Sequence, residues 1–207
     1  MYSTKTATTN NNEFNSSYMP VGINENVTLK EVNVKKTDQG RDFLEIIFEN
    51  AQGQTATLTE WKNEKNQWIV TDEDLQRRDN QQFGRILQVI DAANGSHTDF
   101  EGNSFAEMIN WVKAQLEPAT NTANMRQSMR LKVVYDKKGY TKVSSLGIFV
   151  EPMNVPEEQS QIKLWKNDLL ERPVQADVEK PVDPLTVGIS DSAPVTETNT
   201  GADDLPF

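Results

Sequence analysis

Apolar and polar residues alternate along three consecutive segments in the first third of the chain, which predicts three β-strands. In the first segment, 27–36, the apolar phase shifts at 30–31, so valine and leucine side chains before and after this point lie on opposite faces. Such a shift predicts a bulge or bend. The segments 43–50 and 55–61 keep their alternation, and 51–54 supplies a turn between them. The three strands should form a curled antiparallel meander.

The period then lengthens to that of a helix. Thr71 is placed to cap a first helix whose opening turn is acidic, and Asn94-Gly95 should end it. A second helix should begin at the capping box formed by Ser104 and Glu107, and Pro118 should end it.

Alternation returns near residue 130 and predicts a hairpin that turns at 136–139 and ends near Val150. The segment 156–172 should form a short helix. The chain is therefore expected to be mainly β with α insertions (α+β). Five strands with a helical insertion, usually one helix, between the third and fourth are typical of the OB-fold, a five-stranded Greek-key barrel. A bent first strand suits this fold because it must pair on both sides of the barrel.

Composition divides the 207 residues into three parts. Residues 1–20 are rich in Ser, Thr and Asn and should be disordered, 21–170 should form the folded domain, and 171–207 should be a disordered acidic tail. The chain contains no cysteine, which excludes disulfides and thiolate chemistry. It also has no long apolar run and no signal-peptide pattern, so we expect a soluble protein of the cytoplasm.

Charge is segregated along the chain, although the formal net charge of −10 argues against a nucleic-acid binder as a whole. Between Met125 and Lys142 six basic residues face one acid, whereas past Arg172 seven acids face only Lys180. An acidic protein thus carries one basic stripe and an acidic end.

Enzyme chemistry finds little support in the sequence. His97 is the only histidine, so neither a catalytic triad nor a histidine-rich metal site can be assembled. The acids at 72–74 could bind a divalent cation, but acids in a first helical turn are the expected complement of the helix dipole. We expect no catalytic activity, no metal and no cofactor.

The basic stripe combines cations with aromatic residues on the predicted hairpin. Cations that follow a phosphate backbone, with aromatic faces for stacking, are what single-stranded DNA binding requires. The alternative is a solvated hairpin whose tyrosines pack on the barrel. The predicted DNA-binding residues are Arg126, Arg130, Lys132, Tyr135, Lys137, Lys138, Tyr140 and Lys142, and Trp61, Lys62 and Trp68 could extend this surface from the third strand.

The chain ends in an unusual combination of residues, DDLPF. The Phe207 ring and its free carboxylate lie at one point, Pro206 stiffens the approach, and two acids supply charge. This chemistry suits a small apolar pocket rimmed by cations on another protein. The alternative is an acidic solubilising tail that happens to end in Phe. The predicted protein-interaction tip comprises Asp203, Asp204, Leu205, Pro206 and Phe207.

These five residues closely resemble the acidic C-terminal tip of bacterial and phage single-stranded DNA-binding proteins. The resemblance implies that the tip recruits replication, recombination and repair enzymes, and that it competes with DNA for the basic groove. The body departs from the bacterial pattern because two helices, not one, stand between the third and fourth strands. Its layout is more similar to the divergent phage proteins, which leaves the DNA-contacting residues and the oligomeric state open, a homo-oligomer included.

We therefore expect a sequence-independent single-stranded DNA-binding protein of a bacterial cell or a phage-infected host. Two alternatives carry the same tip: an adaptor that docks on replication enzymes without touching DNA, and a strand-annealing recombination mediator. Stacking and phosphate contacts serve RNA as well as DNA, so this choice stays open.

Overall fold

A computed structural model describes residues 17–121 and 126–173. The predicted tip and nearly all of the predicted disordered segments 1–20 and 171–207 lie outside the described residues. Of the N-terminal segment, residues 17–20 are described and pack on the domain. Met19 is buried, and its backbone N–H donates to the Thr55 carbonyl.

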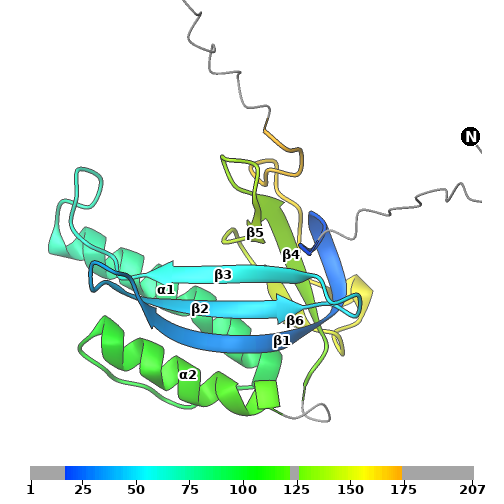
Figure 1. Cartoon of the computed structure of the whole chain (residues 1–207), viewed down its shortest axis with the longest axis horizontal. Helices are drawn as coiled ribbons and strands as arrows, with labels where there is room; N and C mark the ends of the chain where they lie inside the picture. The colour runs from blue at the N-terminus through cyan, green and yellow to red at the C-terminus, as the bar shows by residue number, and fades with distance from the viewer. Residues whose placement is uncertain (1–16, 122–125, 174–207) are drawn as a thin grey trace, which may run out of the picture. The chain divides into compact units, whose positions relative to one another are not determined.

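The order of the elements follows the pattern of three strands, two helices and further strands (Figure 1). The described elements are β1 Gly22–Lys36, β2 Asp42–Glu49, β3 Thr55–Trp61, α1 Asp72–Asn94, α2 Phe105–Asn121, β4 Met129–Tyr135, β5 Thr141–Val143, β6 Val150–Pro152 and a 3₁₀ turn at Glu157–Gln159.

The strands form one antiparallel sheet that nearly closes into a barrel. Hydrogen-bonded neighbours run in the order β3-β2-β1-β4-β5, and β6 pairs with β4 beside β5. The two ends of this order, β3 and β5, lie close to each other. The prediction of a mainly β protein with helical insertions is therefore right at the level of a barrel-like sheet with two helices among the described residues.

The bend of β1 lets one strand serve both sides of the sheet. Its first part pairs with β4 and its second part with β2. The register with β2 shifts between Leu29 and Glu31, as the phase of the sequence predicts. A second shift, between Asn24 and Val27, adjusts the pairing with β4. Because of the first shift, Val27 and Leu29 on one side and Val32 on the other all reach the core.

Both helices begin at the predicted caps. Thr71 Oγ1 accepts a hydrogen bond of 3.0 Å from the Asp74 N–H, and α1 ends at Gly95, whose φ of 83° suits a residue without a Cβ. Ser104 Oγ accepts from the Glu107 N–H at 3.2 Å, but the Glu107 carboxylate accepts from the Asn103 N–H rather than that of Ser104. The capping box is thus displaced by one residue.

The prediction that Pro118 ends α2 is wrong, because the helix continues to Asn121. A proline removes one backbone donor and displaces one carbonyl, which is a local loss. Leu116 and Ala119 are buried on either side of Pro118, so packing against the sheet holds the last turn in place.

Two predictions about the last third of the chain are also wrong. The return strand of the hairpin is broken into β5 and β6, which pair with β4 on either side of an excursion at 144–149. The predicted helix at 156–172 is only a 3₁₀ turn followed by irregular chain. Its residues bond to β4 and to the excursion instead of forming a regular helix.

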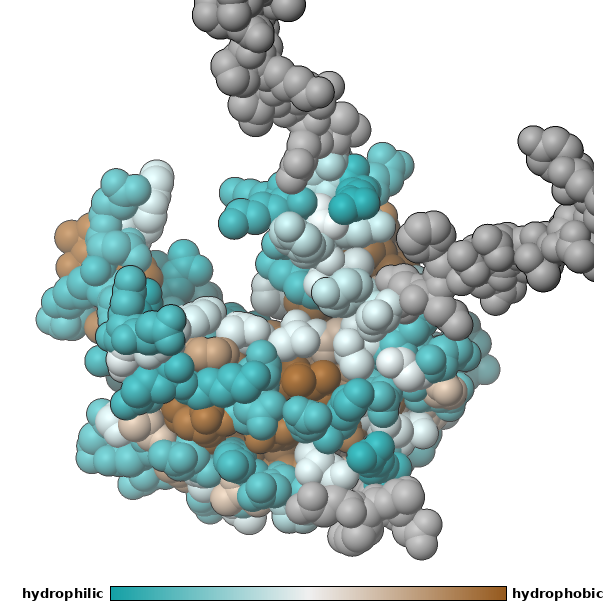
Figure 2. Space-filling model, in the orientation of Figure 1, coloured by the Kyte–Doolittle hydropathy of each residue, from teal (hydrophilic) through white to brown (hydrophobic). Residues whose placement is uncertain are grey.

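The core lies between the inner face of the sheet and the two helices. α2 packs on β1, and α1 packs on β6 and α2 (Figure 1). Hydrophilic residues cover most of the face shown in Figure 2, with hydrophobic residues gathered in its middle over the sheet. Fully buried core side chains include Leu44, Ile46, Phe48, Ile86, Ile90, Ile109, Val112, Leu116, Leu131, Val133 and Phe149.

Truncation of the inner face of β2 should cost far more than truncation of its outer face. Ile46→Ala should lower the free energy of unfolding by about 2–5 kcal/mol, since it leaves a cavity in the core. Ile47→Ala, one residue along and only half-buried, removes the same atoms and should cost much less. Urea unfolding of both variants measures the difference, and equal losses would contradict the assignment of the two faces.

Candidate nucleic-acid interface

Lys132, predicted to bind DNA, is fully buried and is removed from any surface. Its backbone lies opposite the break between β5 and β6: its N–H donates to the Phe149 carbonyl, and its carbonyl accepts from the Ser144 N–H. The position falls on β4, a strand buried on both faces over most of its length. The sequence pattern hides this because strict alternation would have placed Lys132 outside.

The Lys132 ammonium group donates three hydrogen bonds to oxygens from separate parts of the chain. Its Nζ lies 2.9 Å from Asp168 Oδ2, 2.9 Å from the Leu146 carbonyl and 3.0 Å from the Lys163 carbonyl. The side chains of Lys132 and Asp168 are both 0% exposed. Three acceptors and one full counter-charge offset the cost of burying an ammonium group.

Asp168 collects a matching set of donors. Its Oδ2 also accepts from the Trp165 N–H at 2.7 Å, and its Oδ1 accepts from the Ser144 hydroxyl at 3.2 Å. Burial alone raises the pKa of a carboxyl, but these donors and the Lys132 charge outweigh it and hold the pKa of Asp168 below its ordinary value of 3.8. We call the Lys132–Asp168 pair the clasp, because it fastens the excursion 144–149 and the segment 163–170 to β4.

Arg130, also predicted to bind DNA, is buried, and Arg126 is half-buried; both donate hydrogen bonds to other parts of the protein. The Arg130 guanidinium lies 3.1 Å from a Glu151 carboxylate oxygen, 3.2 Å from Glu25 and 2.8 Å from the Val155 carbonyl. Its hydrogen bond to Glu151 raises the pKa of Arg130, although burial opposes this. Arg126 donates to the Thr120 carbonyl near the end of α2. Half of the predicted stripe therefore makes internal hydrogen bonds, and two of its residues, Arg130 and Lys132, are buried.

The other half stays on the surface, at the turn between β4 and β5. Lys137, Lys138 and Lys142 are exposed, and the Tyr140 side chain is 66% exposed. Asp136 shapes this turn, since its Oδ1 accepts from the backbone N–H groups of Lys138 and Tyr140. The bond from Tyr140 is the main cause of a lowered pKa at Asp136, so this carboxyl is ionised and occupied by the turn.

The segment 163–172 lies against the same turn, which sequence reasoning missed. The Tyr135 N–H donates to the Leu169 carbonyl at 2.8 Å. A Cβ on Gly139 would lie 3.1 Å from Arg172 Nε, so the arginine side chain covers the turn. The three cations of KLWKNDLLER could have indicated that this segment joins the basic turn. The predicted helix would have placed them on different faces, so the sequence did not suggest a common surface. We call the assembled residues the basic pole: Lys137, Lys138, Lys142, Lys163, Lys166 and Arg172.

Most cations of the basic pole form no close ion pair within the described part of the chain, although the ionised Asp136 in the same turn attracts Lys138 and Lys142. Among the described residues, Lys137, Lys142, Lys163, Lys166 and Arg172 make no ion pair with another described residue. By contrast, the lysines of β1 pair with the acids of β2. A hollow of about 160 Å³ opens within the pole, lined in part by Tyr135, Lys137, Lys142 and Leu169.

The remaining predicted residues form a second group at the far end of β3, away from the β4–β5 turn (Figure 1). The Trp61 ring stacks on Phe43 with centroids 4.4 Å apart, and the Arg41 guanidinium lies 5.7 Å from the Trp61 ring. Arg41 and Lys62 line one hollow of about 280 Å³. Trp68 is 78% exposed on the connection to α1. The predicted single stripe is therefore two separate groups.

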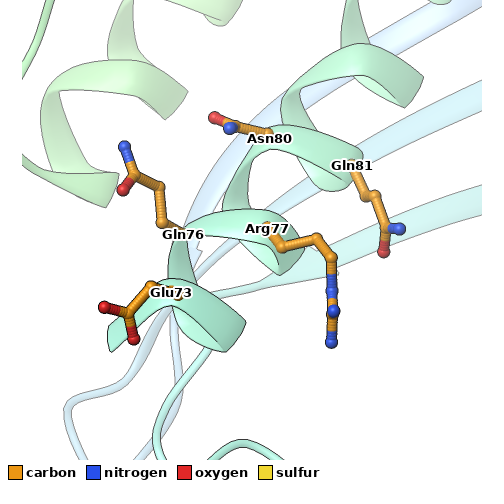
Figure 3. A pocket seen from close by; sticks show the side chains of 5 residues that line it. All are labelled: Glu73, Gln76, Arg77, Asn80 and Gln81. Atoms are coloured by element: carbon orange, nitrogen blue, oxygen red, sulfur yellow. The ribbon is translucent and has the colours of Figure 1, made fainter. Parts of the chain in front are cut away.

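Other surfaces offer less. Figure 3 shows Glu73, Gln76, Arg77, Asn80 and Gln81 spreading from one face of α1, without convergence from a second element. His97 lies 2.7 Å from Asp91 in a loop. Within residues 17–121 and 126–173 no group of three or more His, Cys, Asp or Glu could hold a metal, and no helix there has the length and apolarity to span a membrane.

Breaking the clasp should destabilise the protein in a pH-dependent way. Lys132→Met leaves Asp168 buried without its cation and should lower the free energy of unfolding at neutral pH by about 3–5 kcal/mol. Because the folded-state pKa of Asp168 is lowered, the ionised pair stabilises the protein above pH 3.8 and loses this contribution as the pH falls toward the lowered pKa. The difference between wild type and variant should therefore shrink on acidification.

Urea unfolding across this pH range checks the prediction. Lys142→Met is the matched control, since it removes an exposed cation one strand away and should change stability by no more than about 0.5 kcal/mol. A Lys132→Met loss that is small, or that stays constant with pH, would contradict the role of the clasp.

Comparisons with known proteins assign no family to this arrangement of residues. No family model matches the sequence, and no curated protein matches it. The function must therefore be argued from the chemistry of this chain.

Proposed function

We propose that this protein binds single-stranded DNA without sequence preference and performs no catalysis. The observation that carries the proposal is the basic pole, where five cations that form no close ion pair with a described residue (Lys137, Lys142, Lys163, Lys166 and Arg172) lie near an exposed tyrosine on an otherwise acidic protein. Phosphates supply the counter-charge that these cations lack, and Tyr140 offers a face on which a base can stack.

The arrangement of strands supports an OB-fold. Reading around the barrel gives β1-β2-β3-β5-β4 and back to β1, with the helices inserted between β3 and β4. OB-folds bind oligonucleotides through the face of strands 2 and 3 and the loops that join strands 1 to 2 and 4 to 5. In this chain Arg41 ends the first of these loops and the lysines 137 and 138 lie in the second. On strands 2 and 3, the rings of Phe43 and Trp61 stack on each other.

Two separate groups of cations and aromatics, one at the β4–β5 turn and one at the end of β3, suit a single strand that runs across the protein between them (Figure 1). The outer face between the groups is close to neutral, because Glu45 pairs with Lys35 and Glu49 with Lys30. Stacking on aromatic faces and contacts with phosphates do not depend on the base, which favours binding without sequence preference.

Recruitment of replication, recombination and repair enzymes is proposed for the tip at 203–207, on the resemblance of its five residues alone. The tip lies outside the described residues. An adaptor that docks on such enzymes without binding DNA remains the rival proposal, and a strand-annealing mediator would share the DNA-binding surface.

DNA binding should weaken with salt, and the basic pole should set part of the slope. For single strands the logarithm of affinity falls by about 0.7 per phosphate contacted. Removing Lys137 and Lys142 by substitution with Ala should weaken binding to oligo-dT and reduce the slope by about 1.4. The double variant Arg78→Ala, Lys113→Ala removes the same charge from the helices and serves as the control. Fluorescence titration at several salt concentrations gives both quantities.

An unchanged slope in the Lys137 and Lys142 variant would remove the basic pole from the interface. No binding of wild-type protein to oligo-dT at low salt would favour the adaptor, whereas equal affinity for oligo-U would extend the proposal to RNA.

Deletion of residues 203–207 should separate the two proposed activities. Affinity for oligo-dT should be preserved or increased, because acidic groups that compete with phosphate are lost. Pull-down of a replication polymerase or helicase should be abolished. A truncated protein that retains these partners would remove the tip from the proposal.

A further inference from the structure

Trp165 is an exposed aromatic residue in the segment 163–172, which contributes Lys163, Lys166 and Arg172 to the basic pole. Its side chain is 53% exposed, and it stands two residues from Lys163 and one from Lys166. A large ring left half in water makes little contribution to the core. Its position beside cations that lack acidic partners instead suits a nucleic acid, whose bases present flat apolar faces between charged phosphates.

The backbone of Trp165 is held by the clasp. Its N–H donates to Asp168 Oδ2 at 2.7 Å, and its carbonyl accepts from the Asp168 N–H at 2.9 Å. The Lys132 ammonium group donates to the same carboxylate at 2.9 Å. A buried ion pair thus sets the path of the chain at a surface residue.

The indole is held as well. A Cβ on Gly147 would lie 2.9 Å from Trp165 Nε1, so the ring edge rests directly on the excursion at this glycine. Gly147 has a φ of 63°, a conformation that other residues rarely adopt, and its neighbour Leu146 bonds to Lys132 through its carbonyl. The clasp therefore positions both the Trp165 backbone and the excursion that the indole ring contacts at Gly147. A side chain fixed in this way loses little further entropy on binding.

We propose that Trp165 is a base-stacking residue of the basic pole and that the Lys132–Asp168 pair is its positioning element. The proposal rests on the single-stranded DNA binding proposed above and adds to it a second wall, built from the segment 163–172 opposite the β4–β5 turn. A single strand passing over the pole would contact lysines from both walls and stack one base on the indole.

Substitution of Trp165 separates stacking from charge. Trp165→Ala should weaken binding of the full-length protein to oligo-dT about 5- to 150-fold, the range expected for loss of one stacked base. The slope of affinity against salt should not change, because no phosphate contact is removed. Trp165→Phe keeps an aromatic face and should recover most of the affinity. Trp111→Phe, in the half-buried cluster between the helices, is the control and should have no effect.

The positioning role of the clasp has its own readout. A variant that keeps Trp165 as its only tryptophan should show fluorescence quenching on addition of oligo-dT. Adding Asp168→Asn, which preserves shape but removes the charge that Lys132 pairs with, should reduce this quenching and the affinity together. Gly147→Ala should do the same by displacing the ring. Urea unfolding confirms that each variant is folded at the titration temperature.

The outcomes distinguish the two proposals. If wild-type protein fails to bind oligo-dT, the proposed function fails and the inference fails with it. If wild-type protein binds but Trp165→Ala binds equally well, or Trp165 is not quenched, only the inference is overturned. If Trp165→Ala changes the salt slope as well as the affinity, the residue supports the structure of the pole and does not stack.

Discussion

The structure depends on a lysine that is buried where a surface cation was expected. Lys132 lies at the point where the strand facing β4 is interrupted, and its ammonium group supplies hydrogen bonds that the interrupted pairing cannot. An unpaired ammonium group could not remain there, since its desolvation would cost several kcal/mol. The need to neutralise it draws in Asp168 and, with it, the segment after β6. One buried charge thus determines the course of two irregular stretches of chain.

The same interaction connects the interior with the surface. The segments that bond to Lys132 and Asp168 carry Lys163, Trp165 and Lys166 on their exposed side. Because Asp168 is buried and paired with Lys132, its negative charge does not neutralise the cations of the basic pole. Arg130, two residues before Lys132 on β4, makes a comparable buried pair with Glu151. The charged residues of β4 are therefore buried, whereas the cations of the β4–β5 turn and of the segment 163–172 are exposed.

The barrel and its helical insertion play different roles. Both turns that carry cations and aromatics project from strands whose registers are set by continuous antiparallel pairing, which gives the exposed groups a rigid base. α1 reaches the second group through a buried network, in which Arg85 and Gln82 bind the Glu60 carboxylate and Gln82 also binds the Trp61 carbonyl. The helical insertion thereby supports the stacked pair formed by Trp61 and Phe43.

The sequence by itself determined those features that depend on neighbours along the chain. The three strands predicted at 27–36, 43–50 and 55–61, the phase shift that bends β1, the Thr71 cap and the stop at Gly95 follow from local periodicity and capping chemistry. Each is found in the structure, although β1 begins earlier, at Gly22. Only the tertiary structure decided which cations face water. The alternation that marks Lys132 as exposed assumes a strand with one wet face, but the excursion and the segment 163–170 cover that face. The partner of Lys132 is 36 residues away, and local pattern carries no information about a contact at that separation.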